Sequence, residues 1–375
     1  MPCRVAAEPW KMLRAAPRPL TSPPHVRTLV ISDLHIGSRL GRDVLRRGAA
    51  LDALLCALDD VDRLVLLGDV VELAEGRAAR AMEIAGPVLR AVGARMGAGR
   101  EIVLVPGNHD AALVRPWVRR LGTPLPVDAA MPPDATPALA RIVGWLAPAA
   151  VHVHYPGVWL SSRVWATHGH YLDRHLLPES AFGVARGLLG RLPHDGATAN
   201  DYEQGGPSLT RLEASLTRWL PLPPAALVDD VANYLRAATM PGRSDAPLGH
   251  LLSPLTSRIL GAQMRRASMP ALARVVHRLG VEADWVVFGH VHRLGPLPGD
   301  DASFWAGADG RLRIANTGSW VYEPLLLHHA VPPHPYWPGG AIVLEDEGDP
   351  QAVGLLDGLG AGARPARGGW ARVSS

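Results

Sequence analysis

The sequence has very little of several residue types that define common protein classes. Its 375 residues include two cysteines, Cys3 and Cys56, a single lysine, Lys11, and only 5% aromatic residues. Two cysteines are too few for a disulfide framework or a cysteine-rich zinc module, which favours a reducing compartment. Any metal site must therefore use His, Asp, Glu or Asn side chains.

Long apolar segments and concentrated positive charge are also lacking. Residues 1–24 alternate proline, arginine and small residues without the apolar core of a signal peptide, and Pro148 and Pro156 interrupt the longest apolar stretch, 142–160. We therefore expect a cytoplasmic protein without a membrane span, with peripheral membrane contact left open. The net charge is only +3 and the basic residues are spread along the chain, which argues against a nucleic-acid partner.

The chain does contain enough apolar residues, 47%, for a large buried core. Short β-branched runs alternate with segments of helical periodicity, which predicts an α/β fold. Asp43 is a candidate N-cap for the first helix, and Pro156 with Gly157 predicts a hairpin turn between runs 151–154 and 163–167. We expect strands at 26–32, 63–67, 101–105, 285–288, 312–315 and 341–344, and helices at 43–58 and 80–95.

The pattern divides the chain into a main domain at 25–346 and two flexible tails, 1–24 and 347–375, of which the second is rich in Gly, Ala and Arg. Within the domain, residues 171–283 lack strand patterns and predict an all-helical insertion. Its helical segments are 209–220, 225–238, 248–266 and 270–279. Because the insertion lies between two polar motifs, we expect it to form a lid or a substrate wall.

Five polar motifs each follow a strand-like run, where the carboxyl ends of strands form the ligand-binding crevice of an open α/β sheet. Any one motif has a structural explanation as a turn, but five in this order predict a site for a pair of metal ions. Nitrogen and oxygen donors without thiolates suit Mn, Fe, Zn or Co. The motif residues are Asp33 and His35, Asp69 and Glu72, Asn108 and His109, His168 and His170, and His290 and His292.

The other histidines are expected to be surface or structural residues, whereas His170, two residues from His168, is left open. They are His152, His154, His175, His194, His328 and His329.

The order of the motifs, D-x-H, G-D, G-N-H-D, H and G-H-x-H, resembles the calcineurin-like metallophosphoesterase superfamily over residues 26–344. The resemblance implies a four-layer αββα sandwich with a helical cap insertion. It also implies that Asp33, His35 and His292 hold one ion and that Asn108, His168 and His290 hold the other. Asp69 would bridge the two.

The resemblance further implies a phosphoesterase that uses two divalent ions, with Mn favoured and Fe, Zn or Co as alternatives, to activate a hydroxide. The bond cleaved is a phosphodiester, a pyrophosphate or a phosphomonoester. His109, which the family keeps off the metals, is the candidate to contact phosphate and assist the leaving oxygen. Glu72 is expected to hydrogen-bond to His109 and orient it, while a salt bridge or a helix start would equally explain an acid there.

The expected partner is a small, nucleotide-linked or lipid-linked phosphate ester. One branch of the superfamily hydrolyses UDP-2,3-diacylglucosamine and has a helical cap at this same place. That branch usually has Arg where this chain has His109, and H-G-D where it has His168-Gly169-His170. The leucines of segment 209–220 line one helix face, which either packs on the main domain or receives acyl chains.

Two other functions stay open at the level of sequence. A DNA-repair-type nuclease would use the same first and third motifs, and a steep salt dependence of strand binding would identify it. A non-catalytic scaffold would hold no metal. Arg39, Arg115, Arg174 and Arg293 lie near motifs and are candidates to clamp phosphate, although arginine is equally the default basic residue throughout this chain. Trp320 and Tyr322 are candidates to line the pocket.

Overall fold

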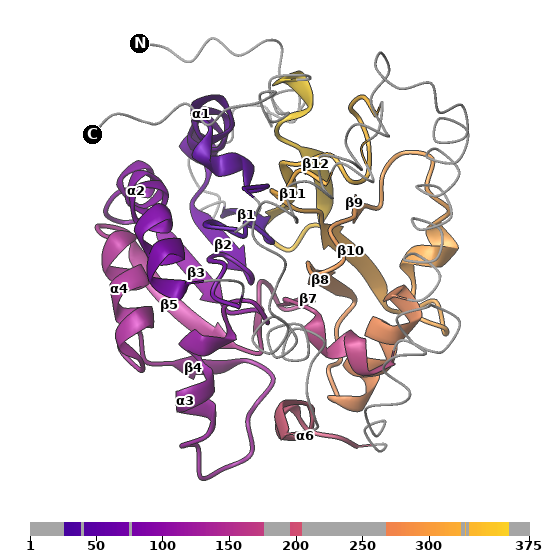
Figure 1. The fold of residues 1–375 in the computed structure, drawn as a ribbon. Helices are drawn as coiled ribbons and strands as arrows, with labels where there is room; N and C mark the ends of the chain where they lie inside the picture. The colour runs from indigo at the N-terminus through magenta and orange to yellow at the C-terminus, as the bar shows by residue number, and fades with distance from the viewer. Residues whose placement is uncertain are drawn as a thin grey trace, which may run out of the picture.

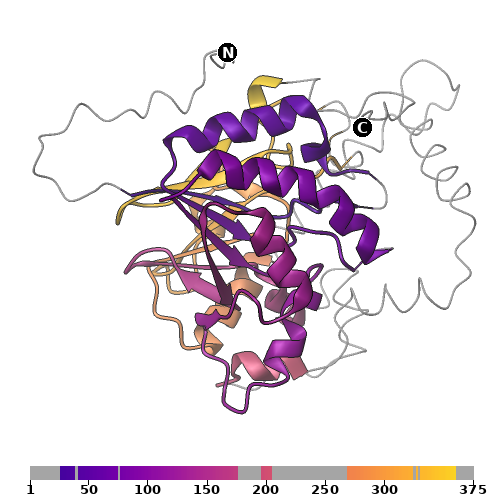
Figure 2. The ribbon, with the colours of Figure 1, turned by 90° about the vertical axis from the view of Figure 1, so that its left-hand side faces the viewer.

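A computed structural model describes residues 26–38, 41–74, 77–175, 196–204, 268–323, 327 and 330–359. Two β-sheets lie face to face, and helices cover their outer faces (Figure 1). Helices α1 (Gly48–Ala57), α2 (Ala78–Met96) and α4 (Pro137–Trp145) lie on the outer face of the larger sheet, as the view turned by 90° shows (Figure 2). A helix at 268–278 lies beside the smaller sheet. This arrangement confirms the predicted four-layer sandwich.

The larger sheet has the strand order β12-β11-β1-β2-β3-β5-β4. Its central strands β1, β2, β3 and β5 are parallel, and β4, β11 and β12 pair antiparallel with their neighbours. The carboxyl ends of the first three strands therefore lie along one edge. The strand bounds are β1 Arg27–Ile31, β2 Arg63–Leu67, β3 Glu101–Val105, β4 Ala129–Met131, β5 Ala150–Tyr155, β11 Gly340–Glu345 and β12 Gln351–Gly354.

The smaller sheet has the order β6-β7-β8-β10-β9, in which β7, β8 and β10 are parallel. The predicted hairpin across Pro156 is wrong, because β5 pairs within the larger sheet and the chain passes to the smaller sheet at Pro156, where β6 pairs with β7. The strand bounds are β6 Gly157–Trp159, β7 Val164–Thr167, β8 Trp285–Phe288, β9 Leu294–Gly295 and β10 Arg313–Thr317.

Short helical elements complete the described residues. They are η2 Val44–Arg46, η3 Leu58–Asp60, η4 Ala111–Leu113, α3 Arg115–Val118, η5 His170–His175, α6 Ala199–Gln204 and η6 Ala302–Trp305. Within the described part of the chain, no helix combines the length and hydropathy that a membrane span needs.

The continuous apolar runs of the central strands follow from burial on both faces. In β2, Leu64 and Leu66 pack into the cluster that contains the outer helices, whereas Val65 and Leu67 pack into the cluster between the two sheets. Successive side chains point to opposite faces, so one strand contributes to both layers of core.

Two local predictions differ from the structure. Asp43 does not cap α1, which begins at Gly48, because its buried carboxylate instead accepts from the Gly37 N–H at 3.1 Å and from Arg46 at 2.7 Å. The C-terminal tail predicted from 347 begins too early, because β12 pairs with β11. This short strand has one pairing partner and a sequence of small residues, so no apolar pattern marks it.

The predicted helical insertion lies mostly outside the described residues. Its segments 209–220, 225–238 and 248–266 fall there, as does the whole of the predicted N-terminal tail, 1–24. The described parts of the insertion are η5, α6 and the helix at 268–278, which corresponds to the predicted segment 270–279.

Candidate metal centre

The motif residues lie in loops that follow five strands of the two sheets. These strands are labelled β1, β2, β3, β7 and β8 in Figure 1. Each of these strands is parallel to its neighbour in this group, so the loops leave at corresponding edges. Asp33 and His35 follow β1, Asp69 follows β2, Asn108 and His109 follow β3, His168 follows β7, and His290 and His292 follow β8.

The backbone is strained at five of these positions. The φ angle is 54° at Asp33, 43° at His35, 52° at Asp69, 66° at His290 and 55° at His292. Residues with a side chain rarely adopt this left-handed region, at a cost on the order of 1–3 kcal/mol each. With one exception, these are the only described non-glycine residues with positive φ. Strain concentrated at the ends of the motif strands indicates loops shaped for function.

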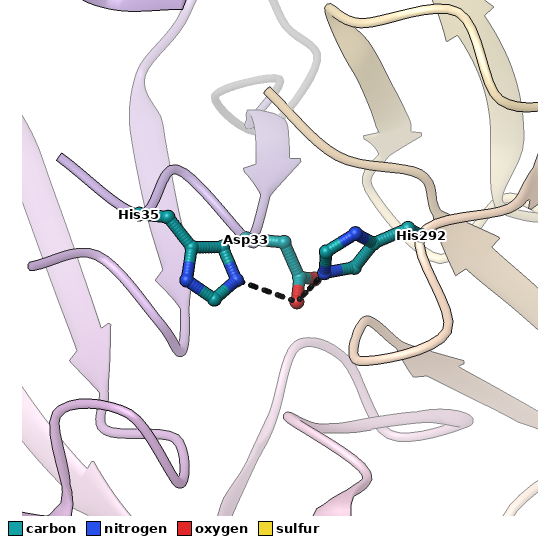
Figure 3. Close-up of side chains that lie close together, drawn as sticks. All are labelled: Asp33, His35 and His292. Carbon is teal, nitrogen blue, oxygen red and sulfur yellow. Dashed lines mark ion pairs between the residues drawn. The ribbon is translucent and has the colours of Figure 1, made fainter. Parts of the chain in front are cut away.

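Asp33, His35 and His292 converge on one point (Figure 3). Oδ1 of Asp33 lies 3.1 Å from Nε2 of His292 and 3.8 Å from Nε2 of His35. The other oxygen of Asp33 accepts from the backbone N–H of His290 at 2.9 Å and from the Ser32 hydroxyl. Oδ1 of Asp33 and Nε2 of His35 are buried without a hydrogen-bond partner. Because buried polar atoms nearly always have one, this pair fits a cation.

Hydrogen bonds at the far side of two imidazole rings determine which nitrogen faces the site. Nδ1 of His35 lies 2.8 Å from Oε2 of Glu72, and Nδ1 of His168 lies 3.0 Å from the carbonyl oxygen of Leu67. Both partners only accept, so Nδ1 carries the proton and donates. Nε2 of each ring therefore faces the site, where it can ligate a metal ion once it is deprotonated.

Asp69, Asn108 and His168 bring three electron-rich atoms together. Nε2 of His168 lies 3.1 Å from Oδ2 of Asp69 and 3.0 Å from Oδ1 of Asn108. Burial lowers the pKa of His168, but the charge of Asp69 outweighs it and raises the pKa to about 9. The negative charge of Asp69, which favours a proton at this position, also favours a metal cation. A site of imidazole nitrogen, carboxylate oxygen and amide oxygen suits a divalent transition metal.

Asp69 lies between the two groups of ligand atoms. Its Oδ2 is 3.1 Å from Nε2 of His168 and 3.7 Å from Nε2 of His35, while its Oδ1 accepts from the His109 N–H at 2.8 Å. One carboxylate oxygen thus faces both groups, as a bridging ligand does. Three sets have ligand atoms within 4.8 Å of one another, namely Asp33, His35 and His292; His35, Asp69 and His109; and Asp69, His168 and His290.

The predicted hydrogen bond between Glu72 and His109 is present, with Nδ1 of His109 2.9 Å from Oε1. The same buried carboxylate also receives His35, which the sequence did not predict. Glu72 lies outside any helix, so the helix-start explanation is wrong. Burial raises the pKa of Glu72, but the hydrogen bonds from His109 and His35 lower it to about 2, which keeps the acid charged. For His109, burial lowers the pKa, and Asp69 with Glu72 raises it above its ordinary value.

Two glycines leave room for candidate ligand side chains. A Cβ on Gly68 would lie 2.3 Å from Nδ1 of His168, and a Cβ on Gly289 would lie 2.5 Å from Oδ2 of Asp33. At each of these two positions, only glycine leaves space for the side chain that approaches from another motif. Packing this close indicates a preorganised site.

The family model of the calcineurin-like phosphoesterases matches residues 26–213, which is half of the chain. The chain belongs to this family. As a calcineurin-like phosphoesterase it is a hydrolase of phosphoric ester bonds, and its family implies a dinuclear centre of divalent ions. His290 and His292 lie beyond the matched residues, and the fold brings them to the other motifs.

Comparison with solved structures gives distant similarities. A cold-active protein-tyrosine phosphatase of a psychrophilic Shewanella has 14% identity and a TM-score of 0.29, with 89% of this chain and 78% of that chain covered. A dimetal phosphatase from Danio rerio has 12% identity and a TM-score of 0.33, with 88% and 99% covered. These scores are too low to support an inference about this phosphoesterase. No curated protein matches it.

Asp110 contributes to the site although the sequence analysis did not single it out. Asp110 is fully buried and accepts from the backbone N–H groups of Val70, at 2.9 Å, and Gly107, at 2.5 Å. It thereby joins the loop after β2 to the loop after β3. Burial, followed by the charge of Asp69, raises its pKa to about 6. The signal was its place at the end of the Gly107-Asn108-His109-Asp110 motif.

Two residues considered for phosphate or pocket contact have other roles in this phosphoesterase. Arg293 is 2% exposed, donates to Asp300 at 2.6 Å and stacks over Trp305, so it is no clamp for phosphate. Trp320 is fully buried and donates to the Gly340 carbonyl at 3.1 Å, so it does not line a pocket.

Three further candidates for the site are Arg174, Arg39 and His170. Arg174 donates to the carbonyl oxygen of Tyr202 at 3.3 Å, whereas Arg39 lies outside the described residues. The ring of His170 lies 5.6 Å from that of His168, outside the three ligand sets. Burial, with the charges of His168 and His290, lowers the pKa of His170 to about 3, so its ring is neutral at pH 7.

Proposed function

We propose that this chain is a dinuclear, Mn²⁺-dependent phosphodiesterase. The observation that carries the proposal is the position of Asp69 Oδ2, 3.1 Å from Nε2 of His168 and 3.7 Å from Nε2 of His35, between two groups of ligand atoms. The proposed ligands of one ion are Asp33, His35 and His292, those of the other are Asn108, His168 and His290, and Asp69 is shared.

Two bound divalent ions supply a nucleophile at neutral pH by lowering the pKa of a coordinated water, and they neutralise charge on the phosphoryl oxygens. The chain itself holds the ligand atoms ready. Glu72 and the Leu67 carbonyl fix the proton on the outer nitrogen of His35 and His168, so neither ring has to reorient when an ion binds.

His109 is the proposed catalytic residue. Its Nδ1 is held by Glu72, which leaves Nε2 to face the substrate. Asp69 and Glu72 favour the protonated ring against the effect of burial, so the ring is a proton donor for the leaving oxygen. Its side chain is 17% exposed, which allows contact with a bound phosphate ester.

The proposed substrates are small nucleotide-linked or lipid-linked diesters and pyrophosphates. The support is the place of the proposed cap, 171–283, between His168 and His290. Its first element, η5, already contacts the site through Asp173, which lies 2.8 Å from His290. A cap joined to the site at this point would form one wall of the substrate pocket.

The proposal is tested by stripping the protein with a chelator and restoring it with Mn²⁺. We expect hydrolysis of bis-p-nitrophenyl phosphate to exceed that of p-nitrophenyl phosphate, and to disappear on chelation. Asp69→Asn should abolish turnover and reduce the bound Mn²⁺ from two ions per chain. UDP-sugar and lipid diesters in the same assay identify the substrate class.

The ligand atoms of His109, His35 and Asp69 lie within 4.8 Å of one another, so His109 could also be a metal ligand. His109→Ala distinguishes a catalytic role from that ligand role. We expect kcat to fall by about 10²–10⁴-fold while two Mn²⁺ ions stay bound. Asp284→Asn, which removes an exposed ion pair with Arg163, is the matched control and should leave both values unchanged. Full diester turnover by Asp69→Asn would contradict the proposal, and salt-sensitive retention of oligonucleotides on filters would favour the nuclease instead.

A further inference from the structure

Asp173 makes a contact with the metal centre that no sequence motif predicts. Its Oδ1 lies 2.8 Å from Nε2 of His290. The two side chains are 15% and 16% exposed, so the pair is largely shielded from water. Asp173 lies in η5, at the start of the insertion, and His290 lies in the loop after β8.

The topology explains why these two residues meet. Strands β7 and β8 are parallel neighbours in which Thr167 lies opposite Phe288, so the loops that follow them leave side by side. The N–H of Gly289 donates to the carbonyl of His168 at 3.1 Å, which holds the loops together. The chain then turns through η5 and returns Asp173 to the ring of His290.

The chemistry of the contact specifies the tautomer of His290. A carboxylate only accepts, so Nε2 of His290 carries the proton and Nδ1 retains the lone pair. This is the reverse of His35 and His168, whose Nδ1 atoms donate and whose Nε2 atoms face the site. A carboxylate behind a ligating imidazole also raises its basicity and fixes its plane.

We propose that Asp173 is a positioning residue that holds His290 as its Nε2–H tautomer and presents Nδ1 to the divalent ion shared with Asp69 and His168. The proposal rests on the proposed function, in which His290 is a metal ligand. It makes the first turn of the insertion part of the metal site. An ion pair that only anchors η5 would stabilise the fold without affecting the tautomer or the metal affinity.

The tautomer is measured on the metal-free protein. Long-range ¹⁵N–¹H NMR of histidine-labelled protein distinguishes the two tautomers, and His290→Gln assigns the His290 signals. We expect the Nε2–H form in the wild type and a mixture in Asp173→Ala. Asp173→Asn keeps an accepting oxygen and should retain the Nε2–H form.

Metal affinity is measured by titrating the stripped protein with Mn²⁺ in a calorimeter. We expect Asp173→Ala to weaken one of two Mn²⁺ ions by about 10–100-fold and Asp173→Asn to recover part of the loss. Asp284→Asn should match the wild type. Thermal unfolding confirms that each variant is folded. Where Asp173→Ala does not fold, the test is the Mn²⁺ affinity of Asp173→Asn, which should lie below that of the wild type.

The outcomes separate the two proposals. If Asp173→Ala retains both the Nε2–H tautomer and two wild-type Mn²⁺ affinities, Asp173 has no positioning role and the metal centre stands without it. If the wild type itself binds fewer than two Mn²⁺ ions, the proposed function fails. The tautomer of His290 then still decides whether Asp173 orients that ring.

Discussion

Gly68 shows how closely the residues of the site depend on one another. Its φ is 85°, and its Cα faces the imidazole of His168, so any Cβ would overlap Nδ1 of that ring. Gly99, in the turn before β3, has a similar φ of 90° but nothing within 4 Å of an added Cβ. Both positions require a positive φ, but only Gly68 has a side chain, that of His168, where a Cβ would lie.

A comparison of Gly68→Ala with Gly99→Ala therefore distinguishes the effect of backbone strain from the effect of displacing the His168 ring. Both should lower the free energy of unfolding by about 1–3 kcal/mol, because alanine is strained at this φ. Only Gly68→Ala should also displace the His168 ring and weaken Mn²⁺ binding by tenfold or more. Denaturant unfolding and calorimetric titration measure the two effects, and equal Mn²⁺ affinities in the two variants would contradict the prediction.

At the residue level, the sequence identifies side chains that act at the ends of strands. Asp69 and His168 stand out because an apolar run stops at each of them. Asp173 gives no such signal, because its contact with His290 depends on the pairing of β7 with β8 and on the path of η5. Arg293 gave a false signal, since proximity to His292 in sequence does not show that its side chain turns away to Asp300.

At the level of elements, η5 ends in a buried histidine surrounded by positive charge. Nδ1 of His175 accepts from Arg278 at 2.9 Å, and its Nε2 donates to the Tyr202 hydroxyl at 2.7 Å. Burial, followed by the charges of Arg278, Arg274 and Arg174, lowers the pKa of His175 from 6.5 to about 4. The folded protein therefore keeps this ring neutral under conditions in which the unfolded chain protonates it.

The sign of the resulting pH dependence follows from the lowered pKa. Stability contributed by neutral His175 is fully present above pH 6.5 and is lost as pH falls toward 4, at up to about 1.4 kcal/mol per pH unit. His175→Gln should flatten the slope of unfolding free energy in this range, measured by urea unfolding. His152→Gln, at an exposed position, should leave the slope unchanged, and equal slopes in the two variants would rule out this role for His175.

Elements with apolar periodicity were predictable, and those without it were not. Helix α2 and strands β1, β2 and β3 follow the sequence pattern because each buries apolar side chains. Strand β12 contains small or polar residues and depends on pairing with β11, so composition alone suggested a tail. The Asp43 carboxylate accepts from the Arg46 side chain and the Gly37 N–H instead of capping a helix, and the sequence pattern does not reveal these donors.

At the level of the whole molecule, the cluster between the two sheets holds the two halves of the site together. Leu344 on β11 is 1% exposed and belongs to this cluster, whereas Val331 is 71% exposed. Leu344→Ala should lower the free energy of unfolding by about 2–5 kcal/mol, and Val331→Ala by less than about 0.5 kcal/mol. Urea denaturation measures both, and similar values would show that the sheets are not held together by this core.

The proposed ligands follow strands of both sheets, so the order of synthesis determines when the set is complete. Asp33 is made early and His292 late, with the whole of the cap region between them. A nascent chain leaving the ribosome thus carries an incomplete set of the proposed ligands until β8 and its loop have been synthesised. On the proposed ligand set, catalysis therefore requires the last third of the chain to pack against the first.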